Sequence, residues 1–282
     1  MMRRHPDWLK VRIGGGETFS KVKTILRTAK LHTICEEAKC PNIAECFGQG
    51  TAVFLILGNI CTRNCRYCNV THGKPGDLNR REPFDVAESV QTLGLNYVVV
   101  TSVSRDDIYD GGASVFYDTV REIRRLNPRC TIEVLIPDFN GDPAALQRVI
   151  DAAPDVINHN IEVVEELFQT IRPQGNYRRS LDVLHTIKST SNGIPTKSGF
   201  MVGLGESLPQ IHATLQDLRA VGVDIVTIGQ YLQPTRHHYE VKKYYTPEEF
   251  VQIKTLAEQM GFRHVESGPL VRSSYHAQNA FL

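Results

Sequence analysis

The sequence lacks any long hydrophobic run. Apolar stretches such as residues 52–57 are far shorter than the roughly 20 residues that a transmembrane helix requires. Residues 1–17 carry several charges and contain no apolar core of a secretory signal. We therefore expect no membrane partner, and we expect a cytoplasmic location or, with a separate presequence, an organellar one.

The sequence also has little net charge, because 32 lysines and arginines nearly balance 31 aspartates and glutamates. A protein that binds along nucleic acid needs a basic excess or a basic stripe to neutralise phosphates. We therefore expect no nucleic-acid partner.

Internal repeats and low-complexity stretches are absent as well, and short apolar runs instead alternate with amphipathic helical patterns. Six runs have the composition of buried parallel strands, at 51–58, 97–102, 131–137, 155–160, 197–203 and 224–230. Helical patterns, several opened by Asp, Ser or Thr and closed by Gly, occupy 82–94, 112–127, 142–153, 207–222 and 246–261.

Strands that alternate with helices in this way predict βαβ units and a parallel sheet. Six strands are two fewer than a complete eight-stranded barrel contains, so we predict an α/β fold, a partial (β/α)6 TIM-like barrel. Residues 1–50 and 265–282 fit no βα unit. We expect them to be N-terminal and C-terminal extensions of a single domain that spans 1–282, with the barrel at 51–264.

The seven cysteines are unevenly distributed, with six of them between residues 35 and 68. A secreted disulfide framework is typical of shorter, loop-rich chains with a signal peptide, so this clustering favours metal binding. Cys130 stands apart, and we expect it to be a thiol without a function.

Cys61, Cys65 and Cys68 have C-x3-C-x2-C spacing and follow the first predicted strand. Functional side chains of α/β barrels lie at the carboxyl ends of the strands, which predicts that this loop covers the barrel mouth. A structural zinc site normally has four protein ligands, and His72 is the nearby candidate for a fourth. A four-iron cluster held by three cysteines leaves one iron open, as catalytic metal sites require. The spacing favours such a cluster, with structural zinc or unrelated thiols as alternatives.

This spacing in a partial α/β barrel resembles the radical S-adenosylmethionine superfamily. The resemblance implies that S-adenosylmethionine binds the open iron. Its reductive cleavage gives a 5′-deoxyadenosyl radical that abstracts hydrogen from an unactivated carbon. The motif alone does not identify the substrate.

Cys35, Cys40 and Cys46 form a second group, with C-x4-C-x5-C spacing, and predict a second iron-sulfur cluster. This group closely resembles that of the lipoyl synthase family. Further matching motifs lie at 101–113, 133–139, 154–162, 196–206, 229–235 and 268–277. Phe47 and Gly175 depart from the residues usual in that family, and neither is an expected ligand.

The resemblance implies a sulfurtransferase that inserts two sulfur atoms at carbons 6 and 8 of an octanoyl chain, with an auxiliary four-iron, four-sulfur cluster as the sulfur donor. The implied cofactors are two such clusters and S-adenosylmethionine. By the family pattern, Cys61, Cys65 and Cys68 bind the radical cluster, and Cys35, Cys40, Cys46 and Ser274 bind the auxiliary cluster.

The same resemblance implies protein partners. The octanoyl chain is attached to a lysine of a lipoyl carrier domain, either in a 2-oxoacid dehydrogenase E2 subunit or in the glycine cleavage H protein. A flavodoxin or a ferredoxin is the expected reductant.

Other polar residues are candidates for contacts with S-adenosylmethionine or substrate. Residues 101–107 end the second predicted strand and 158–160 end the fourth, so their side chains are expected near the mouth. The candidates are Thr101, Arg105, Asp106, Asp107, Glu133, Asn158, Asn160, Arg172, Tyr177 and Lys197. Packing and capping roles are equally compatible with each of them. His159 is a weak candidate for a general base, because hydrogen abstraction by a carbon radical needs none.

Three alternatives remain at this point. Another radical sulfur-inserting or dehydrogenating enzyme would share the first cysteine group. An electron carrier of ferredoxin type would carry C-x2-C-x2-C-x3-C-P spacing, which the sequence does not contain. A zinc-stabilised binding module would be colourless.

Overall fold

The computed structural model describes residues 5–11, 14–275 and 277–281. The described residues form two compact units. The N-terminal unit comprises Val11–Arg63 and Val70–Ile157, and the C-terminal unit comprises Met1–Lys10, Asn64–Asn69 and Asn158–Leu282. That the chain acts as one domain stays a prediction.

The N-terminal unit is built around strands in the order β1-β2-β5-β6-β7. These strands are β1 (His32–Thr33), β2 (Val53–Ile56), β5 (Tyr97–Ser102), β6 (Thr131–Leu135) and β7 (Val156–Asn158, whose last residue is counted with the other unit). β1 is antiparallel to β2, whereas β2 is parallel to β5 and β5 is parallel to β6, with Val53 opposite Val99 and Val99 opposite Glu133. A separate small sheet pairs β3 (Ile60–Cys61) with β4 (Thr71–His72).

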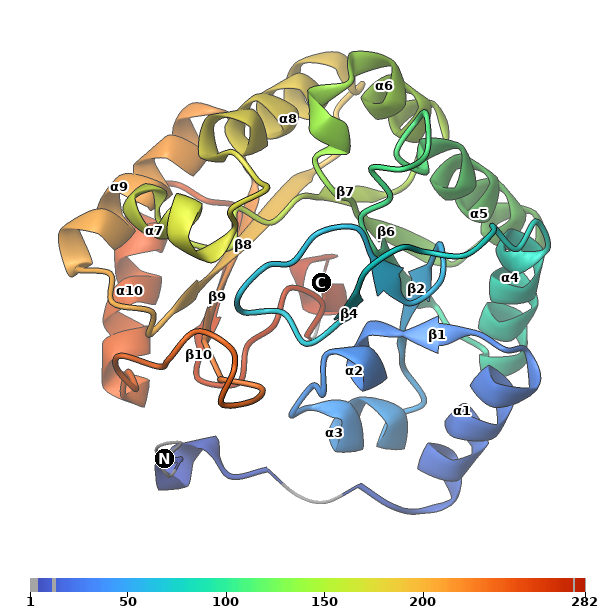
Figure 1. The fold of residues 1–282 in the computed structure, drawn as a ribbon, viewed down its shortest axis with the longest axis horizontal. Helices are drawn as coiled ribbons and strands as arrows, with labels where there is room; N and C mark the ends of the chain where they lie inside the picture. Colours follow the sequence, from blue (N-terminus) through green and yellow to red (C-terminus); the bar gives the residue numbers. More distant parts are fainter. Residues whose placement is uncertain (1–4, 12–13, 276, 282) are drawn as a thin grey trace. The chain divides into compact units, whose positions relative to one another are not determined.

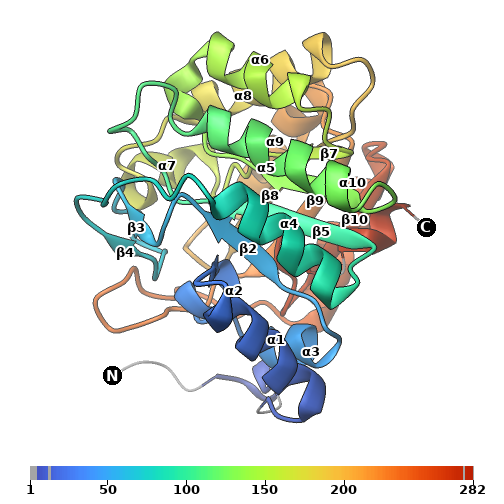
Figure 2. The same cartoon turned by 90° about the vertical axis from the view of Figure 1, so that its right-hand side faces the viewer.

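The helices of this unit are α1 (Glu17–Thr28), α2 (Ile34–Glu37), α3 (Ile43–Gly48), α4 (Glu82–Leu93), α5 (Ala113–Leu126) and α6 (Pro143–Asp151), with a 3-10 turn η2 (Phe139–Gly141). α5 buries Phe116, Val120 and Ile123, which recur every three or four residues and so lie on one side. α4 ends at Gly94, whose left-handed conformation suits glycine. Figure 1 shows α4, α5 and α6 along one face of β2, β5 and β6, and Figure 2 shows α4 and α5 side by side.

The C-terminal unit is built around three parallel strands, β8 (Thr196–Val202), β9 (Ile225–Gln230) and β10 (His264–Gly268). Its helices are α7 (Glu165–Ile171), α8 (Tyr177–Thr190), α9 (Leu208–Ala220) and α10 (Pro247–Gln259), with 3-10 turns η1 (Asp7–Leu9) and η3 (Ala277–Phe281). Capping boxes at Ser207 and Thr246 begin α9 and α10. α8, α9 and α10 lie along one face of the strands in Figure 1, and apolar side chains between them form a buried core.

The predicted α/β class is confirmed, because parallel strands alternate with helices. Each of the six predicted strands and five predicted helices is present within a few residues of its expected range. In the described residues, no helix is both long and apolar enough to cross a bilayer.

The prediction that residues 265–282 fit no βα unit was wrong for residues 265–268. β10 (His264–Gly268) follows α10 and pairs in parallel with β9 over its whole length. Val265 is the buried apolar residue of β10, and its other residues are only partly buried, so the hydrophobic pattern is too weak to predict a strand. Backbone pairing to β9 determines its conformation.

Candidate metal and cofactor site

Cys61 lies at the end of β3 in the N-terminal unit, and its sulfur is hydrogen-bonded by the backbone. The amides of Arg63 and Ser104 donate to Cys61 Sγ at 3.4 and 3.3 Å, respectively. Ser104 lies two residues beyond the carboxyl end of β5, where a parallel strand presents functional residues. Hydrogen bonds to sulfur are a regular feature of iron-sulfur sites, so this environment fits a cluster-bound thiolate.

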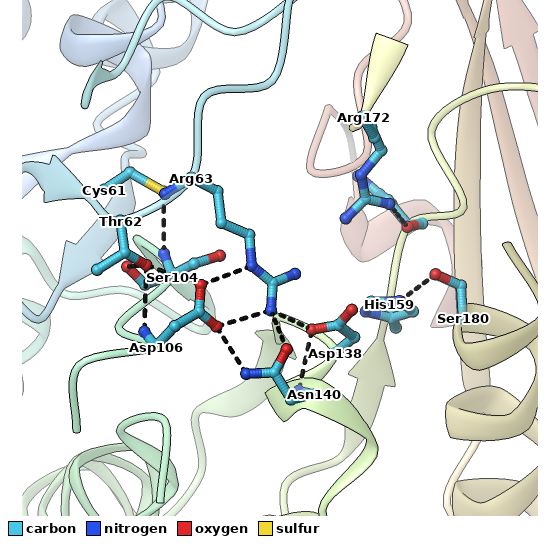
Figure 3. Close-up of polar contacts among 11 residues, drawn as sticks. Cys61, Thr62, Arg63, Ser104, Asp106, Asp138, Asn140, His159, Arg172 and Ser180 are labelled. Carbon is cyan, nitrogen blue, oxygen red and sulfur yellow. Dashed lines mark hydrogen bonds and ion pairs between the residues drawn. The ribbon is translucent and has the colours of Figure 1, made fainter. Parts of the chain in front are cut away.

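Arg63, inside the same cysteine motif, is the centre of a polar group whose contacts the sequence did not predict; Arg63 and Asp138 are buried, whereas Asp106 and Asn140 reach the surface. Its guanidinium donates to Asp106 at 2.7 and 2.8 Å, to Asn140 at 3.0 Å, and pairs with Asp138 at 2.7 Å (Figure 3). Burial alone would lower the pKa of Arg63, but Asp106 and Asp138 raise it. Likewise, burial alone would raise the pKa of Asp106, but Arg63, Thr62 and Asn140 hold it below its usual range.

Cys65 and Cys68 lie in segment Asn64–Asn69, which belongs to the C-terminal unit. Neighbouring backbone holds this segment, because the Arg66 amide donates to the Ile171 carbonyl and the Tyr239 amide donates to the Arg66 carbonyl, both at 2.9 Å. The His238 ring nitrogen Nε2 lies 2.9 Å from the Cys68 carbonyl oxygen. The loop between β9 and α10 therefore fixes this half of the first cysteine motif.

Tyr67, between those two cysteines, packs beside Glu162. Burial, followed by the charge of Glu162, raises the pKa of Tyr67 well above its usual value. Burial also raises the pKa of Glu162, against the opposing effects of Arg172, Asn160 and the Tyr67 hydroxyl. Glu162 has a positive φ of 72°, which is a strained conformation for a non-glycine residue. Neither Tyr67 nor Glu162 was predicted from the sequence.

The second cysteine group lies in the N-terminal unit, with Cys35 on α2, Cys46 on α3 and Cys40 between the two helices. Burial, together with the charges of Cys40 and Cys46, raises the pKa of Cys35 to about 12. Burial, together with Cys40 and Glu45, raises the pKa of Cys46 to about 11. Three thiols close enough to oppose one another's ionisation are a donor set that positively charged iron would stabilise as thiolates.

The described residues contain no group of three Cys, His, Asp or Glu side chains that converge as ligands of one metal ion. A four-iron cluster binds each cysteine through a different iron, so its ligands surround a volume and need not converge on a point.

Ser274, the predicted fourth ligand of the second group, lies after β10 in the C-terminal unit and is half-buried. Its neighbour Ser273 donates from its hydroxyl to Asn160 Oδ1 at 2.5 Å. The two adjacent serines therefore have different surroundings, and Ser273 is tied to the residues that follow β7.

The other candidates in the N-terminal unit have structural partners. Thr101 donates to the Leu135 carbonyl at 2.9 Å, and Glu133 accepts from the Tyr97 hydroxyl at 2.6 Å. Arg105 pairs with Asp107 and donates to the carbonyls of Leu57 and Gly76, which holds the loops after β2 and β5 together. Asp106 alone among them lies beside the Cys61 loop.

In the C-terminal unit the structure brings Asn160, Glu162 and Arg172 together. The Arg172 guanidinium donates to the Asn160 carbonyl at 3.3 Å, and the Asn160 amide donates to Glu162 at 3.2 Å. Asn158 and Lys197 are buried on β7 and β8.

Two further candidates in this unit make internal contacts. The His159 ring lies 3.1 Å from the Ser180 hydroxyl, and Tyr177 donates to Asp217 and packs on Phe168 (Figure 3 shows the His159 pair). With these contacts, His159 and Tyr177 serve as packing residues of the C-terminal unit.

Comparisons with known proteins first define the class. Residues 55–218 match the Radical SAM superfamily, which is more than half of the chain. The solved structure of methylornithine synthase (PylB) has a TM-score of 0.56 at 15% identity and covers 90% of this chain and 83% of its own. Streptococcus suis SuiB bound to S-adenosylmethionine has a TM-score of 0.59 at 9% identity and covers 80% and 54%. The chain belongs to the radical SAM superfamily and has its fold.

The relatives then define the family. Residues 1–40 match the N-terminal domain of lipoyl synthase of the radical SAM family. The lipoyl synthase of Rubrobacter xylanophilus is 56% identical over 272 residues, or 96% of this chain and 85% of the relative. That of Caldicellulosiruptor saccharolyticus is 51% identical over 278 residues, or 99% and 98%. The chain belongs to the lipoyl synthase family, a family of enzymes that use S-adenosylmethionine and four-iron, four-sulfur clusters.

Proposed function

We propose that this chain is a lipoyl synthase that inserts two sulfur atoms at carbons 6 and 8 of an octanoyl chain bound to a carrier lysine. The observation that carries this proposal is the presence of both cysteine groups in a chain that aligns almost end to end with curated lipoyl synthases. When bound, one cluster with S-adenosylmethionine supplies the radical that removes hydrogen from the octanoyl chain, and the auxiliary cluster supplies sulfur.

The cysteines divide between these two tasks. Cys61, Cys65 and Cys68 hold the radical cluster, and this assignment is supported by the two amides that donate to Cys61 Sγ. Cys35, Cys40, Cys46 and Ser274 hold the auxiliary cluster; the grouping of the three cysteines is supported by the effect of Cys40 on the pKa values of Cys35 and Cys46, which burial raises most, and Ser274 is assigned from the family pattern. A serine oxygen is a harder and weaker ligand for iron than a thiolate, which suits an iron that has to leave when the cluster is consumed.

The remaining candidates differ in how well their surroundings suit a contact with S-adenosylmethionine or substrate. Asp106 accepts from Thr62 in the first half of the first cysteine motif, and Arg172 lies close enough to Tyr67 in the second half to affect its pKa. Asn160 accepts from Arg172. Five other candidates stay in the proposal with less support, because several of them already make hydrogen bonds between strands or between loops. They are Thr101, Arg105, Glu133, Asn158 and Lys197.

The partners follow from the reaction. The substrate is an octanoylated carrier domain, such as that of a 2-oxoacid dehydrogenase E2 subunit or the glycine cleavage H protein, and a flavodoxin or ferredoxin supplies electrons. The six proposed cysteine ligands must be reduced to bind iron as thiolates, a state that reducing compartments maintain. We therefore also assign the enzyme to the cytoplasm.

An anaerobic assay tests the reaction directly. The reconstituted protein is reduced with S-adenosylmethionine and an octanoyl-lysine peptide, and 5′-deoxyadenosine and thiolated peptide are quantified. The proposal expects both products and about eight irons per chain, four for each cluster. The absence of both products with intact clusters would overturn it. Formation of 5′-deoxyadenosine without thiolation would instead indicate another radical enzyme of the superfamily.

A further inference from the structure

We propose that Arg63 is a positioning residue for Cys61 and thereby sets the reduction potential of the cluster that Cys61 holds. The inference rests on the proposed role of Cys61 as a ligand. It adds a group that acts through the protein backbone and does not itself bind iron.

The Arg63 side chain is enclosed, with only 4% of its surface exposed. Its carboxylate partners lie on two different connections, Asp106 after β5 and Asp138 after β6. Because β5 and β6 are parallel neighbours, their carboxyl ends meet at one edge of the sheet. Arg63 binds Asp106 through both Nε and Nη2, and Nη2 also pairs with Asp138, a bidentate geometry that a lysine cannot reproduce.

The backbone around Arg63 is tied to the same connection. The Thr62 amide and hydroxyl both donate to the Ser104 carbonyl at 3.0 Å, and the Asp106 amide donates back to the Thr62 hydroxyl at 3.1 Å. The loops at residues 61–63 and 104–106 are therefore joined by several backbone and side-chain hydrogen bonds. The Arg63–Asp106 ion pair is a further contact between them.

The two amides that donate to Cys61 Sγ come from this pair of loops, one from Arg63 itself and one from Ser104, two residues before Asp106. Movement of either loop would change the direction of one amide relative to the sulfur. Hydrogen bonds to ligand sulfur stabilise the more negative, reduced cluster, and they are among the determinants of its potential.

The positive charge of Arg63 also favours the reduced cluster and therefore raises its reduction potential. Asp106 and Asp138 carry two negative charges near the Cys61 loop, and Arg63 compensates one of them. A buried arginine with two carboxylates is a costly way to stabilise a fold, since well-packed apolar residues of similar volume often serve better. The positive charge of Arg63 beside the Cys61 loop instead partly offsets the two carboxylates, and this favours the reduced cluster.

The test uses a Cys40→Ala background, in which the auxiliary cluster is absent and the radical cluster alone is observed. The potential is measured by an anaerobic redox titration followed by electron paramagnetic resonance, without turnover. Arg63→Gln should lower the reduction potential of the cluster. At a fixed solution potential, the ratio of reduced to oxidised cluster should fall by about two- to tenfold, as expected for one lost hydrogen bond. Arg63→Lys should shift it in the same direction by less.

Arg124→Gln is the matched control. Arg124 also pairs with one aspartate, Asp155, at 2.7 Å and donates to a carbonyl, that of Cys130. These partners precede β7 and β6, at the opposite ends of the strands from Arg63. Its substitution should leave the potential unchanged.

Failure of this proposal is separable from failure of the proposed function. If Cys61→Ala keeps an intact four-iron signal in the same background, the ligand assignment is wrong. If Cys61→Ala loses that signal while Arg63→Gln and Arg63→Lys have the potential of the Arg124→Gln control, Arg63 is not a positioning residue. Should Arg63→Gln not fold, as judged by circular dichroism, Arg63→Lys decides the question alone.

Discussion

Cys65 and Cys40 belong to groups that differ in neighbours and in proposed task. Cys65 lies in the segment held by the loop after β9, and Cys40 lies between α2 and α3. We expect Cys65→Ala to abolish formation of 5′-deoxyadenosine, because the cluster that binds S-adenosylmethionine loses a ligand. We expect Cys40→Ala to retain this cleavage and to stop thiolation of the octanoyl peptide. Mass spectrometry of 5′-deoxyadenosine and of thiolated peptide, carried out on both variants, checks these expectations. Lipoyl product from Cys40→Ala would contradict the assignment of the auxiliary cluster as the sulfur source.

The adjacent serines 273 and 274 provide a sharper comparison. Ser274→Ala should reduce thiolation severely and should leave the unfolding free energy of the cluster-free protein nearly unchanged, because it removes a proposed iron ligand whose hydroxyl is only half-buried. Ser273→Ala should cost on the order of 1 kcal/mol of unfolding free energy, since its hydroxyl donates to Asn160. Urea denaturation and single-turnover thiolation, measured on both variants, distinguish the two. A Ser273→Ala variant that lost thiolation while Ser274→Ala kept it would reverse the assignment.

The sequence predicted the individual ligands but did not predict which residues contact them or their loops. The cysteine spacings are local, so residues 35–68 display six of the expected ligands without a structure. The partners of Arg63 lie 43 and 77 positions away, at Asp106 and Asn140. The one available signal was the position of Arg63 inside the cysteine motif, which indicates importance without indicating a partner.

Two glycines allow the chain after β10 to approach the sheet. A Cβ at Gly229 of β9 would overlap the Val271 carbonyl. A Cβ at Gly199 of β8 would overlap Thr227 Oγ1 of β9 and would lie 3.1 Å from both Asn160 Oδ1 and Ser273 Oγ. The segment that carries Ser274 therefore lies directly against β8 and β9, in space that any larger residue would occupy.

We expect Gly229→Ala to displace this segment. Overpacking of this kind costs about 1 to 3 kcal/mol. The iron content should fall toward that of a single cluster, and limited proteolysis should cut the chain after β10 more rapidly. Gly76→Ala is a suitable control, because nothing lies within 4 Å of its Cβ position and the residue is exposed. Full iron content in Gly229→Ala would show that this close approach is not required for the auxiliary cluster.

Among the strands, those with strong periodicity were predicted and those with weak periodicity were not, whereas the amphipathic helices α1 and α8 were not among the predicted helices. The six strands and the amphipathic helices such as α5 have apolar residues at the spacing of their secondary structure. β10 and the short strands β1, β3 and β4 lack this spacing. Their conformation depends on a neighbouring strand that supplies hydrogen-bond partners.

The whole molecule should keep its secondary structure when its clusters are removed. The core of the C-terminal unit consists of apolar side chains from β8–β10, α7–α10 and their connections, and no cysteine is among those described. In the N-terminal unit Cys35 is buried, but the other buried core residues on its strands and helices are apolar and bind no iron. Chelation of iron under reducing conditions should therefore leave the far-ultraviolet circular dichroism nearly unchanged. The melting temperature should fall, because a ligand that binds only the folded state stabilises it by mass action. Loss of most of the helical signal in the apo protein would contradict this expectation.

The sequence by itself determined the α/β class and the chemistry of the clusters, because hydrophobic periodicity and cysteine spacing are properties of short segments. It also determined the family, through motifs distributed over nearly the whole chain. The tertiary structure alone decided that Arg63 joins the loops after β5 and β6, that Tyr67 packs beside Glu162, and that β10 extends the parallel sheet. These contacts join residues distant in sequence. Such contacts form only after the strands have paired, because strand pairing brings segments that are distant in the sequence next to one another.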